Sequence, residues 1–423
     1  MKQILASHPA LDIDCFRSQP LHAWMRFESE LNDGSPSGFG INSRILREYR
    51  PDAQEFDLPV FLIFKPEDAI RNSSSCALRK VLNQSSDATP LFVHPQFIDR
   101  LSGHQKLKNC TITHLKARAS SSVRTVWVLE SGTPLAFVKM HFPATIGRFR
   151  RDMRLYGWLA SLENSKLLAF SLANSNLLPP DTFAILRETG GTFLEGDGIT
   201  EGFGHIEREI IPFPPRTDAA KCPIIPFFSL WASEAKVGAK NTLLAKIILS
   251  TGITYEQLIS LLLVPLLDGY NHSAIKVGLI PECNAQNILW EVDPSMKHCR
   301  VVHRDMMGFF KDITVGLAKD QDSFSSITYH TIGSEHCSDT KLRRSFAFDF
   351  KLSKYVIDPL VSIMSAVYDR SRLSIQSDIA NISKCIIKWP PNYFPDDNMA
   401  YGYPNKRSVG RSSYVCIGNP LYR

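Results

Sequence analysis

The chain has 423 residues, of which 44% are hydrophobic and 21% charged, so it is a globular chain long enough for two or three domains. Its formal net charge of +6 is mild for this length and does not by itself indicate nucleic-acid binding. The nine cysteines are scattered without a C-x-x-C pair, which favours reduced thiols over a disulfide framework or a zinc site.

Two segments are candidates for a signal peptide or a membrane span. Residues 1–8 have no long apolar core, so we do not expect a signal peptide. The most apolar run, residues 258–267, is about ten residues long and far shorter than the roughly 20 that a membrane span needs. We therefore expect a cytoplasmic protein that binds neither a membrane nor nucleic acid.

The first quarter of the chain mixes short helix and strand patterns. Residues 58–64 are an apolar, β-rich run that predicts a buried strand, and residues 90–96 predict a second strand that stops at a proline. Residues 34–40 predict a glycine-rich loop, which lacks the lysine and the spacing of a P-loop.

A predicted β-hairpin carries cations on both strands. Its strands cover residues 120–128 and 136–143. Arg124 and Lys139 on these strands, and Arg151 just beyond them, can converge on one anionic ligand, with serine and threonine hydroxyls beside them. A nucleotide polyphosphate or a polycarboxylate suits such a site, and the alternative is a solvated basic hairpin.

A charged dipeptide ends the next predicted strand. Residues 182–191 form an apolar run that finishes in Arg187-Glu188 and two glycines, a pattern found both at active-site rims and at ordinary strand ends. Residues 191–204 predict a glycine-rich loop, and the proline-rich residues 212–226 predict a junction between domains.

Helical spacing dominates the second half. A kink is expected at Pro265. Helices are predicted at residues 151–162, 243–250, 255–276, 350–370 and 373–387.

A second polar segment lies among these helices. A loop rich in amide side chains runs directly into a strand, residues 278–292, and a return strand follows at residues 300–305. Gln286, Asn287 and Asp305 then lie near one another, and their oxygens are ligands that Mg²⁺ accepts. The alternative is a hairpin with a capped turn and a surface Arg-Asp pair.

In their order and spacing, these motifs resemble the aerobactin synthetase (IucA/IucC) family, whose members build siderophores without a nonribosomal peptide synthetase. The resemblance covers roughly residues 27–423. Ser120–Thr125 is similar to the family's T-S-S-x-R-T motif, and Lys139 and Arg151 match the lysine and arginine that follow it. Arg187-Glu188 is similar to the family's R-E motif. Glu282–Asn287 is similar to E-A-H-G-Q-N, and Arg304–Gly308 is similar to R-D-x-x-G. The closing Asn419-Pro420-Leu421 is similar to the end of several members.

The resemblance implies an α+β fold shaped like a hand, with thumb, fingers and palm, mixed and antiparallel sheets, and a helical palm. It places a thumb-like α/β domain at residues 1–105 and a fingers-like, β-rich ATP-binding domain at 106–225. A palm-like helical domain with the catalytic hairpin follows at 226–423. The chain is shorter than typical members, mainly in the thumb.

The resemblance also implies an ATP-dependent ligase that uses ATP and Mg²⁺. Such an enzyme activates a carboxylic acid, often citrate or a derivative, as an acyl-adenylate and releases pyrophosphate. An amine or a hydroxyl then attacks, which gives an amide or an ester in siderophore biosynthesis. No side-chain nucleophile is needed, and a homodimer is expected because dimers are usual in the family.

Residue roles follow from the same resemblance. The residues expected to act in catalysis are Arg124, Lys139, Arg151 and Glu188. The residues expected to bind ATP are Ser121, Ser122, Arg124, Thr125, Lys139, Gln286 and Asp305. The residues expected to bind the carboxylic acid are Arg151, Asn284 and Arg304. The residues expected to hold Mg²⁺ are Glu282, Gln286 and Asp305.

Two departures from the family pattern leave alternatives open. Residues 34–40 and Tyr49–Asp52 stand where the family has G-H-P-x-H-P-x-x-K and Y-x-P-E, and both histidines and the lysine are missing. Asn284 replaces the histidine of E-A-H-G-Q-N and cannot take up a proton near neutral pH. The alternatives are a catalytically degenerate member that binds nucleotide or a partner synthetase, and a ligase outside siderophore metabolism.

Overall fold

The computed structural model describes most residues of the chain. They are residues 19–32, 45–51, 53–64, 69–72, 76–82, 88–101, 103–146, 149–174, 182–196, 202–217, 222–232, 238–293, 296–319, 331–333, 340–395, 399–401, 415–417 and 420–423. The glycine-rich loop predicted at residues 34–40, and Asn419 of the closing motif, lie outside them.

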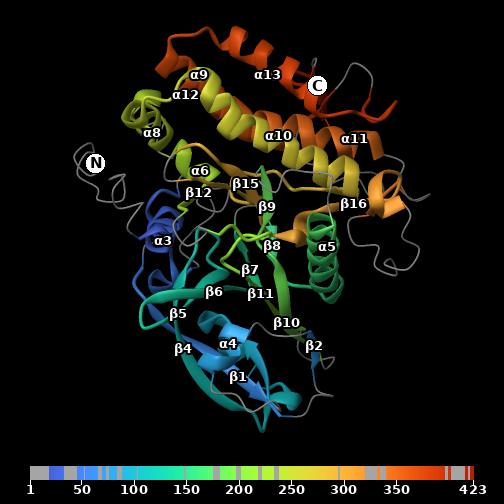
Figure 1. Cartoon of the computed structure of the whole chain (residues 1–423). Coiled ribbons are helices and arrows are strands. Elements are labelled where there is room, and N and C mark those ends of the chain that lie inside the picture. Colours follow the sequence, from blue (N-terminus) through green and yellow to red (C-terminus); the bar gives the residue numbers. More distant parts are fainter. Residues whose placement is uncertain are drawn as a thin grey trace.

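An antiparallel sheet of eight strands forms one end of the molecule (Figure 1). Its strand order is β2-β10-β11-β6-β5-β4-β1-β3. The strands are β1 Phe56–Ile63, β2 Ile70–Asn72, β3 Thr89–Phe92, β4 Thr111–Ala119, β5 Thr125–Glu130, β6 Thr133–Met140, β10 Glu188–Leu194 and β11 Phe203–Arg208. Because β1 pairs with β4, the sheet continues across residue 105, and the thumb–fingers boundary placed there from the sequence stays a prediction.

Strands β5 and β6 form the hairpin predicted from the sequence. Ser131 and Gly132 make its two-residue turn, and both have the positive φ, 49° and 79°, that such turns need. Trp127 and Phe137 face each other across the strands with ring centroids 3.8 Å apart. Trp24 of α3 (Pro20–Glu30) packs edge-on against both rings, which fixes this helix on the hairpin.

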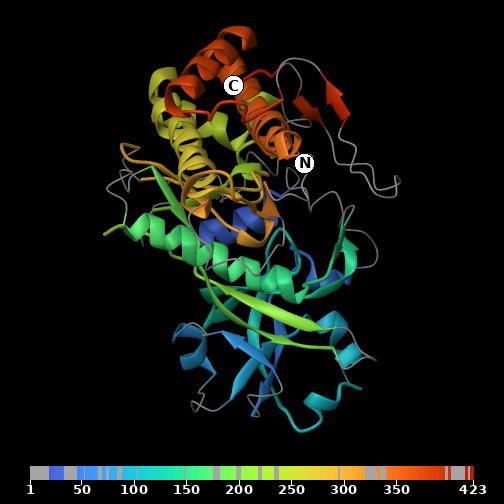
Figure 2. The same ribbon diagram turned by 90° about the vertical axis from the view of Figure 1, so that its right-hand side faces the viewer.

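Helix α5 (Leu155–Ala173) crosses the middle of the molecule between the large sheet and the helical part (Figure 2). Trp158 and Leu162 pack on Phe193 of β10 and Ile206 of β11 in one buried cluster. The indole N–H of Trp158 donates to the carbonyl of His205 at 2.8 Å, which satisfies a polar group inside this cluster.

Two smaller sheets lie next to the helices. The order of the first is β12-β14-β15-β9, in which β9 runs parallel to β15, and that of the second is β13-β16-β17. The strands are β9 Phe183–Ile185, β12 Ile224–Pro226, β13 Leu279–Ile280, β14 Ile288–Glu291, β15 Arg300–His303, β16 Phe310–Asp312 and β17 Thr331–Ile332. Two-stranded sheets are formed by β7 Phe142–Ile146 with β8 Phe149–Arg151, and by β18 Met399–Tyr401 with β19 Val415–Ile417.

Most of the helices gather at the other end of the molecule, whereas α4 (Cys76–Val81) lies at the end formed by the large sheet (Figure 1). Their largest core cluster also includes side chains of β14 and β15. The remaining α-helices are α6 Phe227–Leu230, α8 Leu243–Thr251, α9 Tyr255–Leu258, α10 Val264–Tyr270, α11 Thr340–Ser345, α12 Asp358–Tyr368 and α13 Arg372–Ile386. The π-helical segments are η9 Ile259–Leu263, η10 Asn271–Val277 and η13 Phe346–Ile357. Short 3-10 segments are η3 Arg47–Tyr49, η5 Pro95–Leu101, η6 Gln105–Leu107, η8 Ala239–Asn241, η11 Met306–Gly308 and η12 Gly316–Lys319.

The helical stretch Tyr255–Val277 continues past Pro265. Proline removes a backbone donor and crowds the carbonyl four residues earlier, here that of Leu261. A π-helical turn precedes the proline, and the indole N–H of Trp290 on β14 donates to the Leu261 carbonyl at 3.0 Å. The proline therefore destabilises this helix less than it would a regular helix, because the Leu261 carbonyl accepts a hydrogen bond from Trp290 instead.

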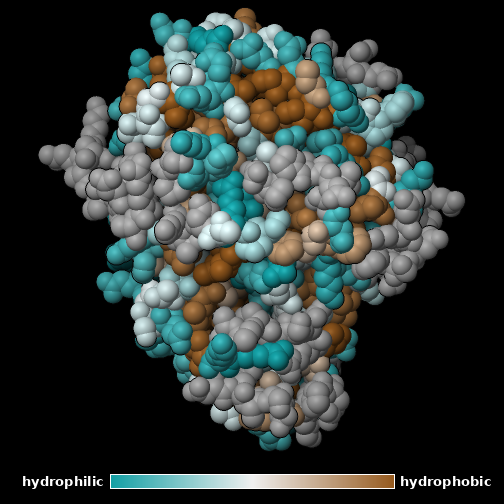
Figure 3. All heavy atoms as spheres, in the orientation of Figure 1, coloured by the Kyte–Doolittle hydropathy of each residue, from teal (hydrophilic) through white to brown (hydrophobic). Residues whose placement is uncertain are grey.

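By length and composition, Tyr255–Val277 is the one helix among the described residues that is able to cross a membrane. Most of its apolar window is buried inside the protein, as expected of a core helix. Apolar side chains also reach the surface over the helical part (Figure 3).

Most predicted elements are confirmed within a few residues, including the strand at 58–64 and the helices at 243–250, 255–276, 350–370 and 373–387. The strand predicted at 90–96 is shorter, since β3 ends at Phe92. The hairpin's first strand begins at Thr125 rather than Ser120, because residues 120–124 turn. The first predicted helix begins at Leu155 rather than Arg151, which still belongs to β8.

The single strand predicted at 182–191 is wrong, and the loop predicted at 191–204 has the wrong bounds. The single strand at 182–191 is two strands, β9 and β10, which belong to different sheets. The glycine-rich loop at 191–204 is bounded by strand on both sides, as Gly191 lies in β10 and Gly204 in β11. Gly191 has φ 152°, and a Cβ there would lie 2.2 Å from the carbonyl oxygen of His205, so the glycine permits close strand pairing rather than a loop.

Leu266→Ala is expected to lower the free energy of unfolding by about 2–5 kcal/mol, because Leu266 is fully buried in the largest core cluster. Leu249→Ala is the matched control, since 66% of Leu249 is exposed, and its effect should stay within about 0.5 kcal/mol. Urea unfolding followed by circular dichroism measures both, and equal effects would contradict the assignment of this core.

Candidate functional site

Residues 120–125 form a tight loop between β4 and β5. The Ser120 N–H donates to the Thr125 carbonyl at 2.9 Å, and Ser122 Oγ accepts from the Thr125 N–H at 3.1 Å. Val123 has φ 64°, which is rare for a β-branched residue, and its buried side chain packs with Phe142. This packing and the internal hydrogen bonds hold a strained loop in one shape.

The N–H groups of this loop already have acceptors. Those of residues 122–125 donate to Ser120 or Ser122, and that of Ser121 donates to Glu28 at 3.3 Å. A glycine-rich phosphate loop instead offers its N–H groups to the ligand. An anion at this loop must therefore be bound by side chains, namely the hydroxyls and the neighbouring cations.

Four charged side chains of alternating sign lie behind the loop. Lys139 on β6 forms an ion pair with Asp305, whose Oδ1 lies 3.7 Å from a guanidinium nitrogen of Arg208 on β11. Arg208 donates to Glu188 at 2.6 and 3.2 Å, and Glu188 also accepts from the Ser161 hydroxyl. All except Asp305 are buried, so Asp305, which lies between Lys139 and Arg208, is the member of this network that is partly exposed to solvent.

The network sets the charges of its members. Burial lowers the pKa of Lys139 to about 8; Arg124 and Arg208 act in the same direction, and Asp305 and Glu188 oppose them. Burial by itself would raise the pKa of Asp305, but Lys139, Arg208 and Arg124 outweigh it and hold this pKa well below its ordinary value. At neutral pH both partners of the Lys139–Asp305 pair are therefore charged.

The Arg187-Glu188 dipeptide is divided between surface and site. Arg187 makes a bidentate ion pair with Glu209, with both distances 2.8 Å, and its guanidinium lies 4.4 Å from the ring centroid of Phe213. Glu188 points the other way into the network, and its backbone N–H donates to Ser165 Oγ at 2.8 Å. Of this motif, Glu188 alone reaches the site.

A pocket opens over the loop and the network. With its open mouth included, it holds about 400 Å³ of empty space. Its lining carries four guanidinium groups and one carboxylate, an excess of positive charge that favours a polyanion. The lining residues are Ser120, Ser122, Arg124, Thr125, Arg151, Arg208, Gln286, Asn287, Arg304 and Asp305.

Arg124 and Arg151 are held together by a backbone contact. Arg124 Nη1 donates to the Arg151 carbonyl at 3.0 Å, and this joins the loop to strand β8. Of the three cations predicted to converge, Arg124 and Arg151 line the pocket, and Lys139 lies behind it in its ion pair with Asp305.

The amide-rich loop before β14 supplies a second wall. Asn284 Oδ1 accepts from the N–H groups of Gln286 and Asn287, both at 3.0 Å, and so closes the turn. Gln286 Nε2 donates to Ser121 Oγ at 3.2 Å, and Arg304 Nε donates to the Gln286 carbonyl at 2.7 Å. Gln286 and Asn287 line the pocket, whereas Asn284 shapes the loop that carries them.

Glu282 is held beside the pocket rather than in its lining. Lys351 of η13 pairs with it at 3.2 Å, and Asn287 Nδ2 lies 3.4 Å from its other carboxylate oxygen. A Cβ on Gly308 would lie 2.5 Å from Glu282 Oε2 and 3.1 Å from Glu282 Cβ. The glycine of the R-D-x-x-G segment therefore makes room for this ion pair.

The pocket lining offers one carboxylate to a metal ion. Among the described residues, no three His, Cys, Asp or Glu side chains are grouped to hold a metal. Asp305 is the single carboxylate among the lining residues, and Gln286 lies beside it. Mg²⁺ is commonly bound by one or two carboxylates together with substrate phosphates, and the lining fits that arrangement.

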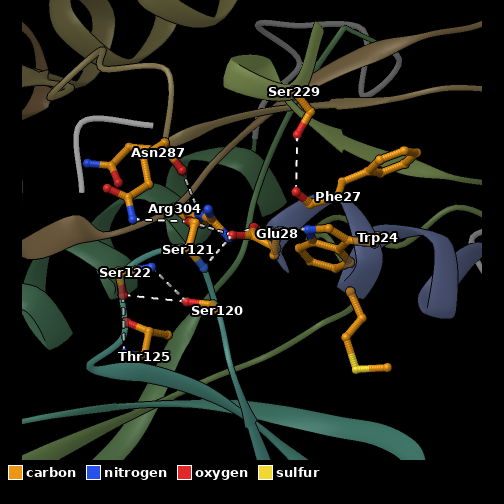
Figure 4. Close-up of polar contacts among 12 residues, drawn as sticks. Trp24, Phe27, Glu28, Ser120, Ser121, Ser122, Thr125, Ser229, Asn287 and Arg304 are labelled. Atoms are coloured by element: carbon orange, nitrogen blue, oxygen red, sulfur yellow. Dashed lines mark hydrogen bonds and ion pairs between the residues drawn. The ribbon is translucent and has the colours of Figure 1, made fainter. Parts of the chain in front are cut away.

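Two residues of the site were missed from the sequence. Arg208 lies on β11, just beyond the segment predicted as a loop; a strand prediction over residues 203–208 would have placed it beside β6. Glu28 of α3 is fully buried and contacts Ser121 and Arg304 (Figure 4). The signal for Glu28 was a carboxylate one helical turn after Trp24, on a face that also carries Phe27.

The predicted site residues fall into three groups. Those that line the pocket are Ser122, Arg124, Thr125, Arg151, Gln286, Arg304 and Asp305. Those directly behind it are Lys139 and Glu188. Those outside the lining, with side chains bonded elsewhere, are Ser121, Glu282 and Asn284. The roles assigned to all of them stay predictions.

Burial contradicts both alternatives, the solvated basic hairpin and the surface Arg-Asp pair. A solvated basic hairpin would expose its cations, yet Lys139 is 1% and Arg124 6% exposed. A surface Arg-Asp pair would expose Arg304, which is 3% exposed.

No family model matches the chain, and no curated protein sequence matches it. Solved structures do resemble it. The petrobactin biosynthesis protein AsbB from Bacillus anthracis str. Sterne has a TM-score of 0.72 at 14% identity, over 94% of this chain and 75% of that one. Aerobactin synthetase IucA from a hypervirulent pathotype of Klebsiella pneumoniae has a TM-score of 0.66 at 14% identity, over 99% and 82%. IucC from the same pathotype has a TM-score of 0.62 at 15% identity, over 99% and 79%.

These likenesses establish the fold. The chain has the mixed helix-and-sheet fold of the petrobactin biosynthesis protein AsbB and of the aerobactin synthetases IucA and IucC, as the motifs predicted. It spans 75–82% of their chains, so it is shorter than these three, as expected. A structure of ATP-bound IucA has the same TM-score to the chain as the IucA structure above, 0.66.

Polyphosphate binding is expected to weaken above pH 8. The ammonium group of Lys139 loses its proton as the pH rises through its pKa of about 8, so the pocket loses a positive charge while Asp305 stays ionised. The affinity for tripolyphosphate, measured by calorimetry, should then fall by up to about tenfold per pH unit. In Lys139→Met, binding should be weak at every pH and this step should be absent; the same pH profile in both proteins would contradict the role of Lys139.

Gly308→Ala is expected to destabilise the protein by about 1–3 kcal/mol, because the new methyl group would overlap Glu282. Gly103→Ala is the matched control, since a Cβ there meets no atom within 4 Å, and its effect should stay within about 0.5 kcal/mol. Thermal unfolding of both variants measures the difference, and a neutral Gly308→Ala would contradict the close contact.

Proposed function

We propose that the chain is an ATP-dependent ligase of siderophore assembly. It activates a carboxylic acid such as citrate as an acyl-adenylate and transfers the acyl group to an amine or a hydroxyl. The proposal rests on one observation above all: four arginines and three hydroxyl side chains line one pocket in a chain with the fold of siderophore synthetases.

In the first step, a carboxylate oxygen of the acid attacks the α-phosphorus of ATP, and the bond to the leaving pyrophosphate breaks. Two anions must approach each other, so cations have to offset their repulsion and the charge that develops on the leaving group. Arg124, Arg208 and the hydroxyls of Ser122 and Thr125 bind the phosphates in this proposal. Lys139 supports them from behind through Asp305.

In the second step, the nitrogen or oxygen nucleophile attacks the acyl carbon, and AMP leaves with the bonding electron pair. Arg151 and Arg304 are proposed to orient the carboxylic acid, because both line the pocket and a guanidinium group matches the two oxygens of a carboxylate. No residue of the chain forms a covalent bond in either step.

Mg²⁺ would neutralise charge on the phosphate oxygens of the substrate. Asp305 and Gln286 are the lining residues suited to hold it. Glu282 is proposed to contribute through its ion pair with Lys351 rather than as a direct ligand. Asn284 is proposed to act by holding Gln286 and Asn287 in place.

A carboxylate-dependent release of pyrophosphate from Mg-ATP tests the proposal, with hydroxylamine as the trapping nucleophile. The panel of acids contains citrate, 2-oxoglutarate and succinate. Arg124→Ala is expected to lower the rate by about 100-fold or more, as for the loss of a group that stabilises transition-state charge.

Arg187→Gln is the matched control, because Arg187 pairs with Glu209 at the surface and does not line the pocket. Its rate should stay within about threefold of wild type, which is under 1 kcal/mol. Full activity in Arg124→Ala would sink the proposal. If the wild-type protein binds ATP but releases no pyrophosphate with any acid, the result would instead favour the degenerate homologue that binds nucleotide without turnover.

A further inference from the structure

Glu28 is a fully buried carboxylate near the pocket that none of the family-like motifs contains. Its Oε2 accepts from Ser121 Oγ at 2.6 Å and from the Ser121 N–H at 3.3 Å. Its Oε1 accepts from Arg304 Nη1 and from the Trp24 indole N–H, the latter at 3.3 Å. A buried carboxylate needs such donors to offset its desolvation, so four donors converge on this one group.

These contacts join segments that are far apart in the sequence. Glu28 lies on α3, Ser121 in the tight loop and Arg304 at the end of β15 (Figure 4). The same Ser121 Oγ accepts from Gln286 Nε2, and the same Arg304 donates to the Gln286 carbonyl. Glu28 thus closes a ring of hydrogen bonds through three residues on two walls of the pocket.

Glu28 itself is not among the lining residues, so its influence must pass through its partners. Holding both donors of Ser121 orients the loop whose neighbouring hydroxyls, Ser120 and Ser122, face the pocket. Holding Nη1 of Arg304, while the Gln286 carbonyl holds Nε, fixes the plane of a guanidinium that lines the pocket. A fixed plane is what bidentate recognition of an anion requires.

The docking of α3 does not depend on Glu28. Trp24 packs against Trp127 and Phe137, and Ser229 Oγ donates to the Leu31 carbonyl at 3.1 Å. Arg118 donates to Ser29 Oγ at 3.1 Å. A conservative change at Glu28 can therefore leave the helix in place, which separates the role of the carboxylate from that of the helix.

We propose that Glu28 is a positioning residue that fixes the Ser120–Thr125 loop and Arg304 for the ligand of this pocket. This inference rests on the proposed function, since ATP is taken as that ligand. Helix α3 then belongs to the nucleotide site, although none of its residues is among those that line the pocket.

The test titrates Mg-ATP into the full-length chain by calorimetry, at a temperature at which circular dichroism shows each protein folded. Glu28→Gln keeps the shape of the side chain but removes its charge and one acceptor oxygen. Its Kd should rise by about tenfold or more, as expected for lost charge-assisted hydrogen bonds. Glu30→Gln is the matched control, because Glu30 lies on the same helix in a surface pair with Arg26, and its Kd should not change.

A mutant cycle with Ser121→Ala separates positioning from general stability. Ser121→Ala alone should raise the Kd by about threefold or more, and the double variant should bind about as weakly as Glu28→Gln, because both changes break the same contact. Fully additive losses would overturn the inference. If Glu28→Gln does not fold, Ser121→Ala decides the question, and unchanged binding in it overturns the inference.

The wild-type titration distinguishes the two proposals. Binding by the wild type, with equal binding by a folded Glu28→Gln, overturns the inference and leaves the proposed function standing. No binding of Mg-ATP by the wild type overturns both.

Discussion

The site depends on one anion placed among buried cations. Lys139, Arg208 and Arg124 come together where little water reaches them, and Asp305 is the carboxylate that lies between them. Removing one partner of a buried ion pair typically costs about 3–5 kcal/mol, because the remaining charge stays unpaired. Asp305 therefore stabilises the cation cluster, while Arg124 and Arg208 still present their charge to the pocket.

The ion pairs of Asp305 with Lys139 and Arg208 join two parts of the fold. The large sheet carries Lys139 on β6 and Arg208 on β11, whereas Asp305 follows β15 of a small sheet on the helical side. Glu28 of α3 binds Arg304, the neighbour of Asp305, and Ser121 of the tight loop, and so it ties the same two parts together. The lining residues come from both parts, so the site is complete only when both parts are packed together.

The sequence predicted what local pattern determines. The hairpin, the long helices and the cations Arg124, Lys139 and Arg151 follow from periodicity, turn residues and motif order. Long-range pairing is not written in any local window, so Arg208 and Glu28 were missed, and the strands around Gly191 were taken for a loop. The Glu188 side chain points into the site, where Ser161 bonds to it, and the Arg187 side chain points outward to Glu209. Both partners lie elsewhere in the chain.

The central claim is that a carboxylate of the substrate attacks the α-phosphorus of ATP in this pocket. Following ¹⁸O from a labelled carboxylic acid tests it most directly, with hydroxylamine as the acyl acceptor and mass spectrometry of the products. The account predicts AMP that carries one ¹⁸O atom, because the oxygen that forms the new bond to phosphorus leaves with AMP. Label in inorganic phosphate with formation of ADP would contradict it, since the attack would then be at the γ-phosphorus.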